Sequence, residues 1–312
     1  METHFTGSRF DKCIYCIGSQ FTRDAYFNFS EFVKDATFEG SEFNRSADFG
    51  RSTFKGDVNF NNCQFNGPAY FSNSYFNKKA YFKDSKFLEL VIVVHSEFGG
   101  EAYFGDSLFN GNVEFDNVRF KDDALFENTR FNDTLSLKRT KYTNLYIKWT
   151  NITRFAYDDA AYLSLIDNFK KLGFFEDADN CYYQYRKERN QEVLKGISQL
   201  IDNGLMTFYG YGVRPFLPFT WSLAFIVLFG VTYLLAPNLI SIYTAIGANV
   251  ANAGAILHPF NISLTVFLSG AKLVDDPKSV IDGFYWIFTL EKLLGSLFLF
   301  LFLVSFGKTI VR

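Results

Sequence analysis

Few side chains in this 312-residue chain suit a reactive or ligand-binding site, and the main candidates lie in its apolar last third. Glu291 stands in a run, residues 284–306, whose only charges are Glu291 and its neighbour Lys292. A carboxylate near membrane depth is a functional candidate because burying its charge in lipid is costly. Gly295 follows one helical turn later. The alternative is an interfacial pair of Glu291 with Lys292 that only sets the depth of a helix.

A second group of candidates precedes that run. Pro259 opens a stretch, residues 260–268, that is apolar enough to enter the edge of a bilayer but too short to cross it. Small and polar residues that could form a pore loop follow, namely Ser269, Gly270, Ala271, Lys272, Asp275 and Asp276. Carboxylate rings favour cations at a channel mouth, whereas a lysine facing the path would repel them. The alternative is that residues 237–282 lie wholly outside the membrane.

The sequence contains few residues or motifs that are typical of an enzyme active site. The chain has three histidines, His4, His95 and His258, and no phosphate-binding loop or nucleophile motif. Cys13 and Cys16 form a single CxxC pair without a second pair in range, so we do not expect a zinc site. We therefore predict a protein that is not an enzyme, with no catalytic residues, no cofactor and no metal.

Two long apolar segments must position the candidates. After Arg214 the chain has no Asp, Glu, Lys or Arg until Lys272. Within this gap, residues 216–236 are long enough to cross a bilayer core of about 30 Å as a helix. A second span is expected at about 286–307, with aromatic residues at its start that suit a membrane interface.

Flanking charges give these spans an orientation. Arg214 precedes the first span, and Lys308 and Arg312 follow the second, which favours cytoplasmic N- and C-termini. The first residues contain no apolar stretch typical of a secretory signal. We therefore expect a multi-pass protein of the cell membrane, with residues 213–312 as its membrane domain.

The first half of the chain is an internal repeat. From Ala25 onward phenylalanine recurs at alternating intervals of five and six residues, with a small residue two positions before it. We expect a solenoid core that includes Phe27, Phe38, Phe49, Phe60, Phe71, Phe82, Phe104, Phe115 and Phe126. Turn residues that tolerate left-handed backbone recur at the corners, as Gly40, Asn62, Asn73, Asp84, Asp106, Asn117 and Asn128. His95 falls at a corner as well, and Cys63 in a small inward position.

With this register, residues from about 3 to 142 resemble the pentapeptide-repeat proteins. The resemblance implies a right-handed quadrilateral β-helix over residues 1–150. If two repeat units close one turn, the rod is about 30 Å long at roughly 4.8 Å per turn. Some members of that family mimic DNA, but residues 1–150 carry 20 acidic and 18 basic side chains, a net charge of −2. That potential is too weak for mimicry, and we expect no nucleic-acid role.

A helical pattern links the two halves, over residues 151–212. Asp158 or Asp159 can cap a first helix that carries Leu163, Ile166 and Phe169 on one face and ends at Gly173. A second helix opens at Glu176, and the pair could seal the end of the β-helix. Residues 197–208 form an amphipathic stretch that would lie on the membrane surface.

The segment 212–312 resembles the potassium-channel pore domains that some microbial pentapeptide-repeat proteins carry at their C-terminus. Two spans around a re-entrant-type loop, the Gly-Val-Arg-Pro approach and the pair Glu291-x-x-x-Gly295 carry this resemblance. It implies a homo-oligomer, and a tetramer if a pore is formed. The Thr-Val-Gly-Tyr-Gly filter that selects potassium is absent. Residues 268–273 stand in its place, and Gly210-Tyr211-Gly212 precedes the first span.

The sequence thus predicts a multidomain β + α membrane protein: a β-helix, a helical hairpin, and two transmembrane α-helices around a re-entrant-type loop. The first hypothesis for function is an ion channel-like protein with a cytoplasmic pentapeptide-repeat domain, its ion undetermined. The second is a membrane-anchored scaffold whose β-helix binds a protein partner without transport. The two hypotheses differ in what they predict for neutralising Asp275, Asp276 or Glu291. The change alters ion flux if these residues line a pathway, and it has no effect if the helices are only an anchor.

Overall fold

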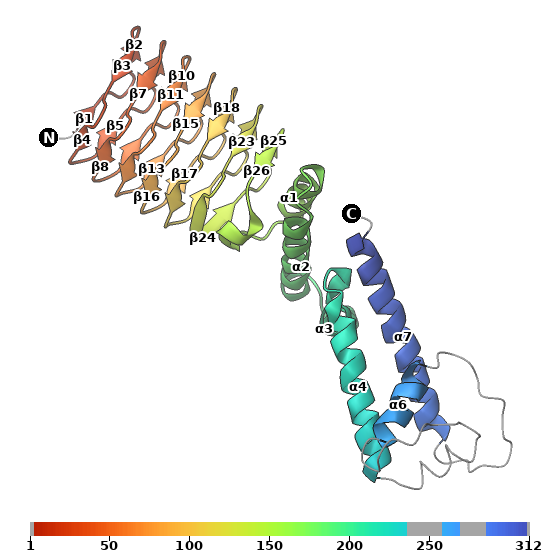
Figure 1. The fold of residues 1–312 in the computed structure, drawn as a ribbon. Coiled ribbons are helices and arrows are strands. Elements are labelled where there is room, and N and C mark those ends of the chain that lie inside the picture. Colours follow the sequence, from red (N-terminus) through yellow and green to blue (C-terminus); the bar gives the residue numbers. More distant parts are fainter. Residues whose placement is uncertain (1–2, 236–257, 269–284, 311–312) are drawn as a thin grey trace. The chain divides into compact units, whose positions relative to one another are not determined.

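The computed structural model describes residues 3–235, 258–268 and 285–310. Its contacts divide the chain into two compact units, Met1–Glu188 and Arg189–Arg312. The N-terminal unit is a β-solenoid of about seven turns followed by helices, and the C-terminal unit is helical in its described part (Figure 1).

Short parallel strands form three sheets along the solenoid. A 13-stranded sheet runs in the order β1 (Thr3–His4), β5 (Ala25–Tyr26), β9 (Ala47–Asp48), β13 (Ala69–Tyr70), β17 (Val91–Ile92), β21 (Val113–Glu114), β24 (Arg130–Ser136), β20 (Leu108–Phe109), β16 (Lys86–Phe87), β12 (Gln64–Phe65), β8 (Glu42–Phe43) and β4 (Gln20–Phe21), with β27 (Ile152–Phe155) also paired to β24.

Each of the other two sheets has seven strands. One runs β2 (Arg9–Phe10), β6 (Glu31–Phe32), β10 (Thr53–Phe54), β14 (Tyr75–Phe76), β18 (Glu97–Phe98), β22 (Arg119–Phe120) and β25 (Lys141–Tyr142). The other runs β26 (Leu145–Tyr146), β23 (Ala124–Leu125), β19 (Ala102–Tyr103), β15 (Ala80–Tyr81), β11 (Val58–Asn59), β7 (Ala36–Thr37) and β3 (Ile14–Tyr15). Successive turns are offset by 22 residues, as in the pairing of Phe54 with Phe76, and by 20 or 21 residues where β26 and β27 pair at the C-terminal end.

Phenylalanine rings fill the interior of the solenoid. All nine phenylalanines expected in the core are at most 3% exposed. Rings one turn apart are stacked, as for Phe27 and Phe49, whose centroids lie 4.9 Å apart at an interplanar angle of 2°. Rings within one turn meet edge to face, as for Phe27 and Phe38, or at a tilt, as for Phe38 and Phe43. Each such pair contributes about 0.5–1.5 kcal/mol beyond the burial of its apolar area.

The small inward residues form a second ladder, of hydrogen bonds. The Ser52 hydroxyl donates to the Phe27 carbonyl at 2.7 Å and accepts from the Ser30 backbone N–H at 3.2 Å. Ser74 and Ser96 repeat the pattern on the same side. Cys63 takes one of these positions, with its thiol 3.0 Å from the Phe38 carbonyl. The serines are therefore partners for backbone groups at the corners, as buried polar groups require.

The predicted corner residues do adopt left-handed backbone. Gly40, Asn62, Asn73, Asp84, Asp106, Asn117 and Asn128 all have φ between 55° and 67°. His95, with φ of 62°, is a corner residue too. The same position is occupied elsewhere by Phe29, Arg51 and Arg139, which are residue types that rarely adopt this conformation.

A helical hairpin packs on the last turns of the solenoid. Helix α1 (Asp159–Lys171) is capped by Asp158, whose side chain accepts from the Ala161 N–H. Helix α2 (Phe175–Glu192) follows, and the 3-10 turn η1 (Trp149–Asn151) precedes β27. The Asn168 side chain bonds both the N–H and the carbonyl of Leu145, which fixes α1 on strand β26.

The buried face of α1 differs in part from the expected one. Ile166 and Phe169 are buried as expected, but Leu163 is 47% exposed. Tyr162 and Leu165 take the inward positions instead, because residues 162, 165, 166 and 169 are spaced three or four apart and share one face of the helix. Tyr162 is fully buried and its ring packs edge-on to Phe155 at 4.9 Å.

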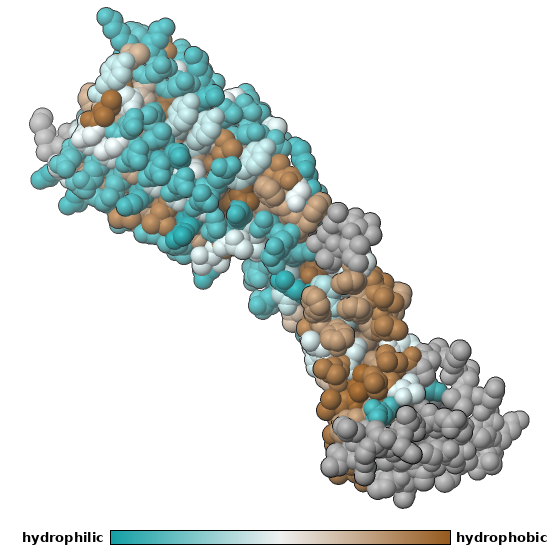
Figure 2. All heavy atoms as spheres, in the orientation of Figure 1, coloured by the Kyte–Doolittle hydropathy of each residue, from teal (hydrophilic) through white to brown (hydrophobic). Residues whose placement is uncertain are grey.

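The C-terminal unit contains α3 (Ile197–Tyr209), the 3-10 turn η2 (Gly210–Gly212), α4 (Phe216–Leu235), α6 (His258–Leu268) and α7 (Tyr285–Ile310). Segments of α4 and α7, Phe216–Leu235 and Trp286–Lys308, are long and apolar enough to cross a membrane. Their outer surface is largely hydrophobic in Figure 2. Helix α3 also exposes an apolar face, made by Ile197, Leu200, Ile201, Leu205 and Phe208.

The Gly-Tyr-Gly sequence is the turn between α3 and α4. Gly210, Tyr211 and Gly212 all have positive φ, of 56°, 56° and 76°. The Tyr211 hydroxyl donates to the buried Asp202 carboxylate at 2.6 Å, which also accepts from the Asn190 side chain. These bonds hold a strained turn that connects α3 to α4.

Candidate functional site

The candidate site lies where the short helix α6 packs against both α4 and α7 (Figure 1). Helix α6 has 11 residues and is therefore about 16 Å long. That is about half the hydrocarbon core of a bilayer. The sequence predicts that the stretch starting at Pro259 is too short to cross a bilayer, and the 11 residues of α6 agree with that prediction.

Glu291 of α7 is the centre of the site. Its side chain is fully buried, and one carboxylate oxygen accepts from the Tyr233 hydroxyl of α4. The other oxygen accepts from the Ser263 hydroxyl of α6. The Ser263 oxygen also lies 2.9 Å from the carbonyl oxygen of Ile226 in α4. One carboxyl group thus joins all three helices through buried hydrogen bonds.

Aromatic packing closes the site around these polar atoms. The Tyr233 ring, itself fully buried, stacks on Phe288 at a centroid distance of 5.4 Å. Ile262 and Val266 of α6 complete the small apolar cluster. Since the polar atoms are enclosed by apolar side chains, each bond is stronger than it would be in water, and losing one is correspondingly expensive.

Glycines allow close packing on both sides of α6, against its backbone at Gly295 and against an aromatic ring at Gly230. A Cβ on Gly295 would lie 2.0 Å from the Phe267 carbonyl oxygen. A Cβ on Gly230 of α4 would lie 2.3 Å from the Phe260 ring. Glu291 thus contacts Ser263 and Gly295 contacts Phe267, so α6 runs parallel to α7. On the other side Ile226 contacts Ser263 and Gly230 contacts Phe260, so α6 runs antiparallel to α4.

Glu291 and its neighbour Lys292 have different surroundings. Glu291 is enclosed among hydroxyl donors, while Lys292 is partly exposed. The hydrogen bonds of Glu291 therefore connect α7 to α4 and α6. This burial favours the hypothesis that the carboxyl group has a role beyond setting helix depth.

The structure brings together two of the expected site residues, Glu291 and Gly295, and places both against α6. The expected pore-loop residues, Ser269, Gly270, Ala271, Lys272, Asp275 and Asp276, lie outside the described residues. Sequence reasoning missed Tyr233, Ser263 and Gly230. The two hydroxyl residues could have been found from the sequence, because a hydroxyl in an apolar membrane segment needs a hydrogen-bond partner inside the protein. For Tyr233 and Ser263 that partner is the Glu291 carboxylate.

Comparison with known proteins informs the N-terminal unit. Residues 17–64, 60–107 and 94–141 match the family described as "Pentapeptide repeats (9 copies)". The pentapeptide repeats expected from the phenylalanine register are thereby confirmed over this part of the chain. No curated protein and no solved structure matches the chain.

Proposed function

We propose that this protein forms an ion-conducting pore in a membrane, with α4 and α7 as its spans and its pentapeptide repeats as a docking scaffold. The observation that carries the proposal is the pair of buried hydrogen bonds by which the Glu291 carboxylate joins α6 to α4 and α7. A helix of half the membrane thickness, fixed by a buried carboxyl group between two helices of spanning length, has the layout of a pore helix.

The physical argument concerns the C-terminal end of α6. The last four carbonyl groups of a helix lack partners within the helix, and they carry about half a negative charge. Within lipid such groups are tolerated only where they are buried in protein or line water. Two spans cannot enclose them, so several copies must. We therefore propose a homo-oligomer, and a tetramer by the resemblance to channel pore domains.

The charges near this end favour cations. The helix end is negative, and Asp275 and Asp276 follow it in the sequence. In the sequence, Lys272 stands between residue 268 and these two aspartates, and the chain contains no potassium filter motif. We therefore propose a cation pathway that need not discriminate potassium from sodium. The positive charges of Arg214, Lys308 and Arg312 favour a cytoplasmic position for both termini, which we include in this proposal.

Ion flux through the purified protein in liposomes tests this proposal. Gradients of potassium, sodium and chloride would be compared for the parent protein, an Asp275→Asn/Asp276→Asn variant, and Glu127→Gln, which removes an exposed carboxylate of the solenoid. We expect cation flux that the double variant reduces and that Glu127→Gln leaves unchanged. Absence of flux in every gradient, from protein shown to be oligomeric and inserted, would contradict the pore and favour a membrane-anchored scaffold.

A further inference from the structure

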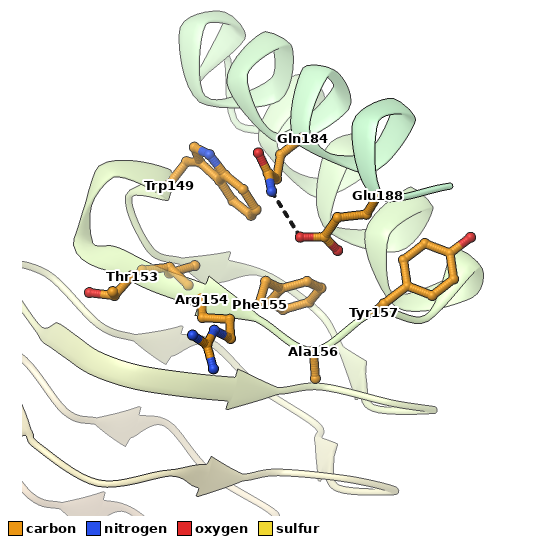
Figure 3. A pocket seen from close by; sticks show the side chains of 9 residues that line it. Trp149, Thr153, Arg154, Phe155, Ala156, Tyr157, Gln184 and Glu188 are labelled. Carbon is orange, nitrogen blue, oxygen red and sulfur yellow. Dashed lines mark hydrogen bonds between the residues drawn. The ribbon is translucent and has the colours of Figure 1, made fainter. Parts of the chain in front are cut away.

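A cleft of about 480 Å³ lies between the last strand of the solenoid and helix α2. Figure 3 shows β27 with Thr153, Arg154 and Phe155 on one side, and Gln184 and Glu188 of α2 on the other. Trp149 and Tyr157 also line the cleft. All these residues belong to the N-terminal unit.

One edge of β27 faces away from the rest of the sheet. Among the residues that the structure describes, β27 pairs with β24 and with no other strand. The Ala156 N–H donates to the Leu135 carbonyl at 2.9 Å, so it points toward β24. Successive residues of a strand direct their backbone groups to opposite sides. The N–H and carbonyl groups of Thr153 and Phe155 therefore point toward the free edge.

We propose that this cleft binds an extended peptide segment of another protein, which adds to β27 as a further strand and carries an acidic residue beside Arg154. Strand addition at a free edge supplies backbone hydrogen bonds, and side-chain pockets supply specificity. Four residues of β27 span about 13 Å, so the paired segment is about four residues long. In effect the peptide takes the place of the next turn of the solenoid.

The acidic preference follows from charge pairing elsewhere on the solenoid. Oppositely charged residues occupy equivalent positions in adjacent turns, as Glu31 does beside Arg9 and Glu101 beside Lys79. Arg154 is exposed, and within the described part of the chain it has no ion pair. A peptide in the position of the next turn would complete this pattern with a carboxylate.

The helix side of the cleft is already ordered. One Glu188 oxygen accepts from the Tyr162 hydroxyl and the other from the Gln184 side chain, both at 2.9 Å. Burial first, and then the charge of Glu188, raise the pKa of the Tyr162 hydroxyl, which therefore remains a donor at neutral pH. The wall opposite β27 thus keeps its shape without a ligand, and the cleft is prepared for binding.

The test uses the full chain in lipid nanodiscs and a random linear-peptide library displayed on phage. Enriched peptides would be resynthesised with fluorescein, and their Kd measured against the parent protein, Thr153→Pro and Thr153→Ala. Proline removes the outward N–H, and edge strands tolerate it at such positions. We expect peptides with an acidic residue at a fixed position, about tenfold weaker binding to Thr153→Pro, and unchanged binding to Thr153→Ala.

Arg154→Glu provides a second variant that leaves the backbone intact should Thr153→Pro fail to fold. Arg154→Glu should weaken the binding of the acidic peptides and strengthen the binding of versions with lysine in place of the acidic residue. The proposal is overturned if no peptide is enriched, if enriched peptides bind both variants as well as the parent, or if the cleft is instead filled by a second copy of this chain. Since peptide binding is measured without ion flux, its outcome is independent of the proposed pore.

Discussion

Gly295 of α7 lies directly against Phe267 of α6, with no room for a side chain between the two backbones. A Cβ on Gly295 would stand 2.0 Å from the Phe267 carbonyl oxygen, which is backbone and cannot swing away. We therefore expect Gly295→Ala to push α6 off α7 and to destabilise the C-terminal unit by about 1–3 kcal/mol, the usual cost of overpacking.

Gly307 provides the matched control for that substitution. It lies in the same helix, and a Cβ there would meet nothing within 4 Å. Gly307→Ala should be neutral or slightly stabilising, since alanine favours a helix by about 1 kcal/mol over glycine. Thermal unfolding of both variants in detergent makes the comparison, and equal midpoints would contradict the tight contact.

The hydrogen bonds of Glu291 predict a coupling between helices. Glu291→Leu should leave the buried Tyr233 hydroxyl without its acceptor, at a cost of about 1–3 kcal/mol. Adding Tyr233→Phe should recover part of that loss, because the unpaired hydroxyl is then gone. Unfolding of the two single variants and the double variant gives the coupling energy. Strictly additive effects would show that the two side chains do not interact.

The serine ladder of the solenoid predicts a cost for removing a single hydroxyl. The Ser74 hydroxyl donates to the Phe49 carbonyl at 2.8 Å and accepts from the Ser52 N–H. Ser74→Ala should destabilise the solenoid by about 1–3 kcal/mol, because buried backbone groups lose their partner. Ser72→Ala, at a half-buried outward position, should have little effect. Amide hydrogen exchange in the neighbouring turns measures both.

Cys63 predicts a dependence on alkaline pH. Burial raises the pKa of the Cys63 thiol to about 12. In the unfolded chain a thiol ionises near about 8.5, so ionisation favours unfolding increasingly as the pH rises from about 8.5 toward 12. Cys63→Ser should therefore match the parent protein below pH 8 and unfold less readily than it above pH 9. Denaturant titrations at several pH values test this, and parallel curves for the two proteins would contradict it.

One corner residue predicts a stabilising substitution. Arg139 has φ of 58°, a conformation that costs an ordinary residue roughly 1 kcal/mol and glycine almost nothing. Arg139→Gly should therefore stabilise the solenoid slightly, by up to about 1 kcal/mol. Arg130→Gly, in strand β24, should destabilise it instead. If both variants unfold at lower temperature than the parent, relief of corner strain is not the dominant effect.

The repeat made much of the solenoid predictable, because its phenylalanines and its corner residues recur with one period. Asn73 and Asp106 could be placed at left-handed corners from their residue types alone. The bonds of Ser74 could not, since they depend on which residues of other turns lie beside it. For the same reason the apolar stretch after Pro259 was recognisable, but its attachment to Glu291 and Tyr233 depends on three-dimensional packing that a periodic pattern does not encode.

The offset of 22 residues that the paired strands keep until the last turn of the solenoid has a consequence for how such a chain can change in length. Excising one complete turn, such as residues 53–74, would leave every remaining strand facing an equivalent neighbour, with Ser30 and Ser96 still in register. Duplicating that turn would do the same. The solenoid is thus a modular spacer, which evolution or an engineer can lengthen or shorten in steps of roughly 4.8 Å without redesigning its interior.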